Sequence, residues 1–118
     1  MSGPAKYIAL LMRSREKAHM YHLTTKSFAE HKALQAYYEG IVPLLDAYAE
    51  AYMGKYGRLK RMTLPRNNAR TRVGARAYFK GLLTRIRACR MPRDTYLKNI
   101  QDEVTALVRS TLYMLTLK

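Results

Sequence analysis

The lengths of the breaks between helical stretches constrain this chain more than any other feature. Apolar residues recur every three to four positions, the period of amphipathic helices, over residues 5–23, 28–53, 70–90 and 94 to nearly 118. The first break, Thr24–Ser27, and the last, Met91–Arg93, are short, whereas the middle one spans residues 54–69. A short connection joins antiparallel neighbours, while the middle one, at ~3.3 Å per residue, can reach ~50 Å and run the length of a bundle. The pattern predicts an all-α four-helix bundle with a long crossover between helices two and three.

Local signals place two of the helix starts. Ser27-Phe28-Ala29-Glu30 has the S-x-x-E form of a capping box, so the second helix is expected to begin at Phe28. Asp94 follows a Met-Pro-Arg turn and is predicted to cap the fourth helix. Within the second helix, Pro43 removes one backbone donor and predicts a kink between Gly40 and Pro43.

Composition limits where such a chain can work. Its 118 residues suffice for one hydrophobic core, so residues 1–118 are predicted to form a single domain. There is no apolar run near the ~18 residues that a membrane helix needs, nor a signal-peptide pattern. The single cysteine, Cys89, excludes an intrachain disulfide and suits a reducing compartment. We therefore expect no membrane association, and a location in a cytoplasm or in a particle assembled there.

Positive charge is concentrated in one part of the chain. The formal net charge is +14, and no Asp or Glu occurs between Ala51 and Arg93. Such a one-sided block predicts a polyanionic partner, either nucleic acid or the acidic surface of another subunit. The alternative is a solvated helix face that keeps the protein in solution. The residues predicted to make these contacts are Arg58, Lys60, Arg61, Arg66, Arg70, Arg72 and Arg76.

The candidate metal ligands lie in the first two helices. His22 and His31 flank the first turn, whereas Asp46 and Glu50 lie ~22 Å and ~28 Å beyond His31 along a helix. One subunit cannot bring all four to one ion, but two subunits whose second helices pack antiparallel about a two-fold axis can. Imidazole with carboxylate suits Fe, Mn or Zn. The alternative is a polar strip that binds no metal. Small residues that would allow close packing of two such helices are Ala33, Ala36, Gly40, Pro43, Ala47, Ala51 and Gly54.

These positions resemble the ferroxidase region of the Dps family, the DNA-protecting mini-ferritins. His31 precedes Asp46 by fifteen residues, and Glu50 follows four later, as in that family. The resemblance implies a ferritin-like fold, a homo-oligomer assembled through helix two, and iron held between subunits by His22, His31, Asp46 and Glu50. It also implies ferroxidase activity at most, because Gln35 stands where the family has a further acidic ligand. The separation of His22 and His31 is shorter than the family's, and Leu23 replaces its tryptophan.

Over nearly its full length the chain also resembles a family of small tailed-phage proteins. The shared segments are HLTTKSFAEHKALQAYYEG, GKYG and NIQDEVTALVRSTLYML. This resemblance implies a phage protein, placed in the infected host's cytoplasm or in the virion. Three hypotheses follow: a Dps-like oligomer with a basic surface for nucleic acid, a non-enzymatic virion component such as a head–tail adaptor or internal protein, and a nucleic-acid-binding accessory protein.

Overall fold

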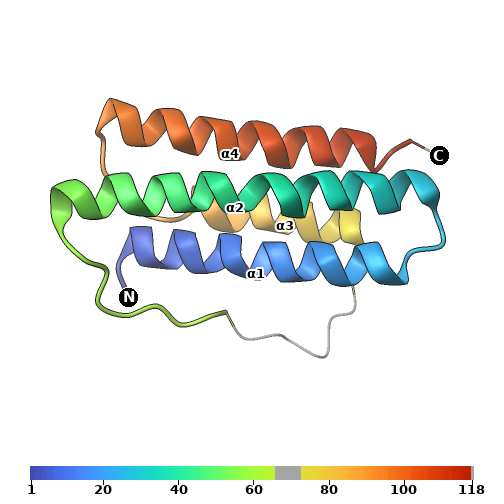
Figure 1. Ribbon diagram of the computed structural model, residues 1–118, viewed down its shortest axis with the longest axis horizontal. Coiled ribbons are helices and arrows are strands. Elements are labelled where there is room, and N and C mark those ends of the chain that lie inside the picture. Colours follow the sequence, from blue (N-terminus) through green and yellow to red (C-terminus); the bar gives the residue numbers. More distant parts are fainter. Residues whose placement is uncertain (66–72, 118) are drawn as a thin grey trace.

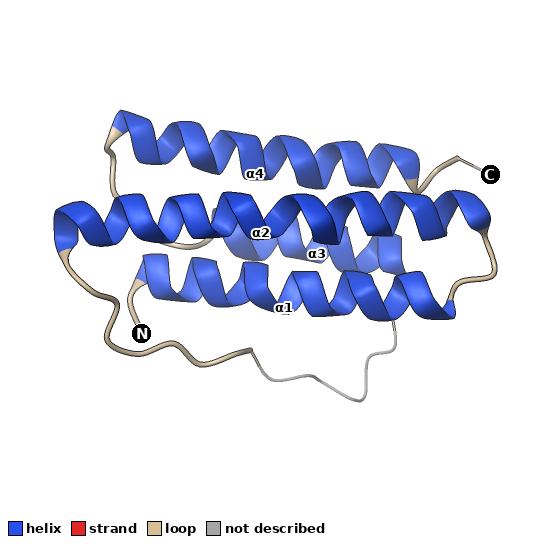
Figure 2. Ribbon diagram, in the orientation of Figure 1, coloured by secondary structure: helices blue, strands red, loops and turns tan. Residues whose placement is uncertain are grey.

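Four helices build the described part of the protein, as the sequence predicts. The computed structural model describes residues 1–65 and 73–117, and within these ranges it contains helices and loops but no strand (Figures 1 and 2). In the described residues, none of the helices combines the length and the apolar character needed to cross a membrane. The helices are α1 (Gly3–Thr24), α2 (Phe28–Tyr56), α3 (Ala75–Arg87) and α4 (Thr95–Met114).

Side-chain caps fix the starts of the two long helices. The Ser2 hydroxyl accepts a hydrogen bond from the Ala5 amide at 3.2 Å, and the Ser27 hydroxyl accepts one from the Glu30 amide at the same distance. Each bond satisfies a first-turn donor that has no partner within the helix. The predicted start of α2 at Phe28 is therefore confirmed.

The helix directions confirm the long crossover. α1 and α2 run antiparallel, and α3 runs in the same direction as α2, so α3 begins at the end of the bundle opposite to the one where α2 finishes (Figure 1). Residues on both sides of the segment 66–72 are tied to α1. Arg13 Nη2 donates to the Pro65 carbonyl at 2.5 Å, and the Tyr21 hydroxyl donates to the Val73 carbonyl at 2.7 Å. The connection is thus anchored along α1 on both sides of the central segment.

The core lies between α1 and α2 and extends onto the other two helices. α4 packs on α2, and α3 packs on α1 and α4. Tyr37 of α2 meets Phe79 of α3 edge-to-face at 4.7 Å between ring centroids, and its hydroxyl shares a 2.5 Å hydrogen bond with Ser14 of α1. The large side chains that are fully buried include Tyr7, Leu11, Leu34, Tyr37, Ile41, Tyr48, Phe79, Leu82, Leu97, Val104 and Val108.

α3 is shorter than the sequence pattern predicted. Val73 and Gly74 are not helical, so the helix begins at Ala75, and it ends at Arg87; the predicted start at residues 70–72 lies outside the described residues. With 13 residues, α3 is ~20 Å long, against ~44 Å for the 29 residues of α2.

Part of the small-residue face of α2 already serves packing inside the subunit. Ala33 is buried, and a Cβ added to Gly40 would lie 3.3 Å from a methyl group of Leu107 in α4. Ala36, Pro43 and Ala47 remain exposed. The close approach that these small residues predict is therefore made in part by α4. α2 continues as one helix through Pro43.

Candidate functional site

The first predicted pair of ligands meets at the α1–α2 turn. The rings of His22 and His31 stack with centroids 3.6 Å apart and planes 22° apart. Each ring also bonds to the other residue's backbone: His22 Nδ1 lies 2.7 Å from the His31 carbonyl oxygen, and His31 Nδ1 lies 2.8 Å from the His22 carbonyl oxygen. The tight turn capped by Ser27 brings the two residues to the same level of the hairpin.

These reciprocal bonds assign the protonation of both rings. A carbonyl oxygen only accepts hydrogen bonds, so each Nδ1 must carry a proton and donate. In a neutral imidazole this leaves Nε2 as the acceptor. Because the stack and the two bonds act together, the histidines join the last turn of α1 to the first turn of α2.

The third histidine and a tyrosine complete this cluster. The His19 ring lies 4.7 Å from the Tyr38 ring and 6.0 Å from that of His22, centroid to centroid. The Tyr38 ring in turn meets His22 edge-on at 5.3 Å. All three histidines of the chain therefore gather at one end of the bundle, and Tyr38 is a member that sequence reasoning did not single out.

The predicted carboxylate ligands do not join the histidines within one subunit. Asp46 and Glu50 are exposed on α2, and Asp46 borders a groove of about 380 Å³ that is also lined by Arg15, Glu16 and Leu64. Over residues 1–65 and 73–117, no three His, Cys, Asp or Glu side chains are grouped to hold one metal ion. This separation agrees with the helical arithmetic, and the two-subunit metal site stays a prediction.

Gln35 also takes a different role from that of a ligand. Its Nε2 donates to Glu39 Oε1 at 3.1 Å, one turn further along α2. The position that resembles an acidic metal ligand is therefore engaged in a surface hydrogen bond.

Where the structure describes them, the basic residues of the second predicted site are exposed. Arg58, Lys60 and Arg61 follow α2, and Arg76 lies in the first turn of α3. Arg66, Arg70 and Arg72 lie outside the described residues. Across the part of the chain that the structure describes, the ion pairs are Arg13–Glu16 and Lys55–Asp94. Neither pair contains one of the exposed cations in residues 58–93, which are Arg58, Lys60, Arg61, Arg76, Lys80, Arg85, Arg87, Arg90 and Arg93.

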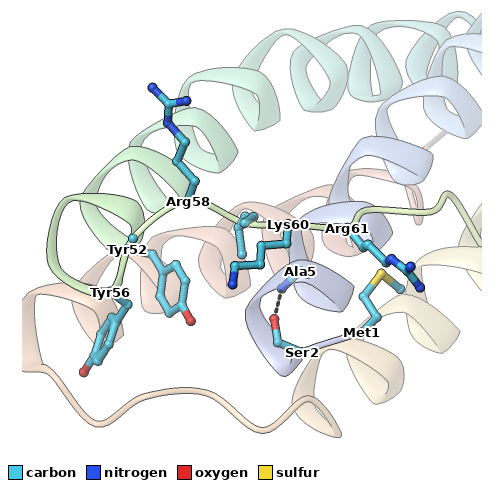
Figure 3. A pocket seen from close by; sticks show the side chains of 10 residues that line it. Met1, Ser2, Ala5, Tyr52, Tyr56, Arg58, Lys60 and Arg61 are labelled. Atoms are coloured by element: carbon cyan, nitrogen blue, oxygen red, sulfur yellow. Dashed lines mark hydrogen bonds between the residues drawn. The ribbon is translucent and has the colours of Figure 1, made fainter.

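A pocket among these cations is the feature that sequence reasoning missed. It has a volume of about 430 Å³ and lies between the start of α1, the end of α2 and residues 57–61. Tyr52 and Tyr56 lie side by side on one wall, and Lys60 reaches from the connection toward them (Figure 3). Arg61 lies beside Met1, whereas Arg58 points away (Figure 3).

The tyrosines belong to a ladder that rises from the core to the surface. Tyr48 is fully buried, Tyr52 is half-buried and Tyr56 is 48% exposed. The Tyr52 and Tyr56 rings stack at 4.9 Å with planes 27° apart, and the Tyr48 and Tyr52 rings are 6.5 Å apart and nearly parallel. The available sequence signal was the spacing of these tyrosines by four residues, which places them on one helix face.

Asp94 is the N-cap residue of α4, as predicted, and its side chain bonds to the end of α2. It occupies the N-cap position, but its side chain accepts no bond from an α4 amide. One carboxylate oxygen accepts from Lys55 Nζ and the other from the Tyr56 hydroxyl, the latter at 2.5 Å. These bonds hold the pKa of Asp94 below its usual value and raise the pKa of Lys55 and of Tyr56. The predicted N-cap position is therefore confirmed, but the carboxylate bonds to a cation and a phenol on α2 and not to an α4 amide.

Comparison with known proteins assigns a family. Residues 22–115 match the DUF5856 family of unknown function, and the chain belongs to this family. An uncharacterized 14.6 kDa protein from the mobD-ri intergenic region of Enterobacteria phage T4 is 35% identical over 60 residues, which cover 51% of this chain and 47% of the T4 protein. The aligned part thus spans about half of that relative. No solved structure matches. The findings support the resemblance to small phage proteins, and no Dps or ferritin family is among them.

Proposed function

We propose that this DUF5856 family member is a non-enzymatic phage protein that binds nucleic acid through its phosphates. One observation carries the proposal: the exposed cations of residues 58–93 form no ion pair within the described part of the chain. Cations left without acidic neighbours attract a polyanion, and each phosphate contact gains free energy by releasing counterions from the nucleic acid.

The two basic segments lie against the same helix. The connection after α2 is bonded to α1 through Arg13 and Pro65, and α3 also packs on α1. On α3, Arg76 and Lys80 are one turn apart and exposed. Contacts of this kind position a nucleic acid without reading its sequence, so we expect binding to depend on salt and little on base composition.

Fluorescence polarisation with a labelled oligonucleotide tests the proposal. The logarithm of the affinity should fall steeply with the logarithm of salt concentration. Arg76→Ala/Lys80→Ala should weaken binding more than the control Lys98→Ala/Arg109→Ala, which removes the same charge from exposed positions of α4. A flat salt dependence, or equal losses in the two variants, would contradict a basic binding surface.

The virion hypothesis assigns the same cations to packaged DNA or acidic subunits. Mass spectrometry of purified particles separates these settings, because many copies per particle indicate a virion component. Absence from particles, together with oligonucleotide binding, indicates a role in the infected cell.

A metal site between two subunits is a second candidate function. Its support is the chemistry of the histidine pair: with Nδ1–H donating to a carbonyl, each ring offers Nε2 as its ligand atom, as metal-bound histidines commonly do. Asp46 and Glu50 are exposed on α2, where a second subunit could supply them. Oxygen uptake after addition of ferrous iron, with and without Asp46→Ala/Glu50→Ala, tests this candidate. If the unmodified protein takes up no oxygen, ferroxidase activity is ruled out. If the double variant still binds metal as well as the unmodified protein does, Asp46 and Glu50 are not its ligands.

A further inference from the structure

We propose that the pocket between α1, α2 and residues 57–61 takes an unpaired nucleobase together with its phosphate. The protein would then prefer single-stranded nucleic acid, or a frayed strand end, over duplex. This inference rests on the proposed function, because the pocket acts as a subsite of a nucleic-acid surface.

The wall of the pocket provides aromatic surface for a base. Tyr52 and Tyr56 stack on one another at 4.9 Å and both line the pocket, and Tyr56 is 48% exposed. Bases stack on aromatic side chains regardless of sequence, because every base has a π-face. A volume of about 430 Å³ falls within the usual range of small-ligand pockets.

The rim of the pocket provides positive charge for a phosphate. Lys60 is directed toward the tyrosines and Arg61 lies at the α1 side (Figure 3). The first turn of α1, which contributes Ala5 to the lining, contains no acidic residue, so the positive end of its helix dipole is not neutralised there. Among the residues that the structure describes, no Asp or Glu lines the pocket.

The nearest carboxylate does not cancel this charge. Asp94 bonds to the Tyr56 hydroxyl, but it is paired with Lys55 at the same time. The bond also holds the Tyr56 ring in place, so the aromatic wall is fixed before a ligand arrives. A fixed wall lowers the entropy cost of binding.

Only an unpaired base can use such a pocket. In a duplex both faces of a base are stacked on its neighbours, and extracting it costs a few kcal/mol. Phosphates, in contrast, are accessible in both forms. The cations of α3 should therefore act equally on single and double strands, whereas the tyrosines should act on single strands alone.

Binding of one oligonucleotide as a single strand and as a duplex tests this inference. We expect the wild-type protein to bind the single strand about tenfold more tightly at equal salt, the size of one stacked base. Tyr52→Leu/Tyr56→Leu should abolish this preference and leave duplex affinity within about twofold. Tyr56→Phe, which keeps the ring and loses the bond to Asp94, is the matched control and should retain most of the preference, with only the loss due to a less fixed ring. Arg76→Ala/Lys80→Ala should lower the affinity for the single strand and for the duplex by the same factor.

The outcomes separate this inference from the proposed function. If neither form binds, the proposed function is wrong; if both bind equally, or the tyrosine variant keeps the preference, the pocket proposal is wrong. Should the double variant lose its helical circular dichroism, amide chemical shifts of the wild-type protein on titration with deoxyadenosine monophosphate decide the matter. Shifts at Tyr52, Tyr56 and Lys60 support the pocket, and shifts confined to α3 overturn it.

Discussion

The two ends of the bundle use polar residues in opposite ways. At the α1–α2 turn, the polar groups of His22 and His31 bond to each other's backbone, and their rings are stacked. At the opposite end, where α2 finishes (Figure 1), Lys60 and Arg61 of the following connection are exposed and line a pocket with Tyr52 and Tyr56 (Figure 3). At the first end these polar groups bond within the α1–α2 hairpin, whereas the second end presents charge and aromatic surface to solvent.

The difference separates residues that hold the fold from residues available to a partner. A buried polar group left without its partner costs about 1–3 kcal/mol. Mutation of the His22–His31 pair should therefore lower the free energy of unfolding before it affects anything else. An exposed cation without an ion pair contributes little to stability. Its removal should be felt in binding instead.

The largest effect should come from reversing charge at the open end. Arg58→Glu/Lys60→Glu/Arg61→Glu removes three cations and adds three anions, so oligonucleotide affinity should fall by about 100-fold at low salt. The thermal midpoint should stay nearly constant, because these side chains form no ion pair within the described residues. The control Lys32→Glu/Lys98→Glu/Arg109→Glu makes the same charge change on α2 and α4. An equal loss in the control would mean that net charge, and not the open end, governs binding.

A close backbone contact also fixes the open end, and it can be broken at one residue. A Cβ at Gly3 would lie 1.8 Å from the Arg90 carbonyl oxygen, so Gly3→Ala should cost about 1–3 kcal/mol of the free energy of unfolding. At Gly54, near the end of α2, an added Cβ meets no atom within 4 Å, and Gly54→Ala should stabilise by about 0.5 kcal/mol. Urea unfolding measures both changes. Equal stability of the two variants would contradict the contact between α1 and the α3–α4 turn.

Loss of the histidine interlock should reduce stability without changing binding. His22→Ala removes the ring stack and the donor to the His31 carbonyl, at a cost of about 1–2 kcal/mol in the free energy of unfolding. His19→Ala is the matched control, since the His19 ring packs on Tyr38 but makes no side-chain hydrogen bond within the described residues. It should cost less than half as much. Weakened oligonucleotide binding in His22→Ala, at full folding, would show that the two ends are coupled.

The smallest effect should be the acid dependence of the Asp94 contacts. Its folded pKa lies below the ordinary value of 3.8, chiefly because of the bonds from Lys55 and Tyr56. The stability from these bonds is therefore present above pH 3.8 and lost as the pH falls through the folded pKa. The difference in thermal midpoint between wild type and Asp94→Asn, a few degrees at most, should shrink between pH 6 and pH 3. For the control Asp102→Asn, the difference in thermal midpoint from wild type should be near zero at every pH. If the difference for Asp94→Asn does not change with pH, the charge of Asp94 does not contribute to stability.

Local sequence signals were sufficient for the architecture of this protein. The helical period located all four helices, the Ser27 box located the start of α2, and the long middle connection predicted that α2 and α3 run in the same direction. These features depend on residues within a few positions of one another or on the length of chain between them. The basic block was visible for the same reason, since composition needs no tertiary contact.

Only the tertiary structure decided which polar residues meet. The sequence marked His22, His31, Asp46 and Glu50 as one candidate set, but the hairpin stacks the histidines on each other and leaves the carboxylates further along α2. Likewise, Tyr52 and Lys60 join Ala5, which lies more than forty residues earlier, to form the open pocket. A helix pattern says which face a side chain occupies, but its neighbour across the bundle depends on how that face packs against another helix.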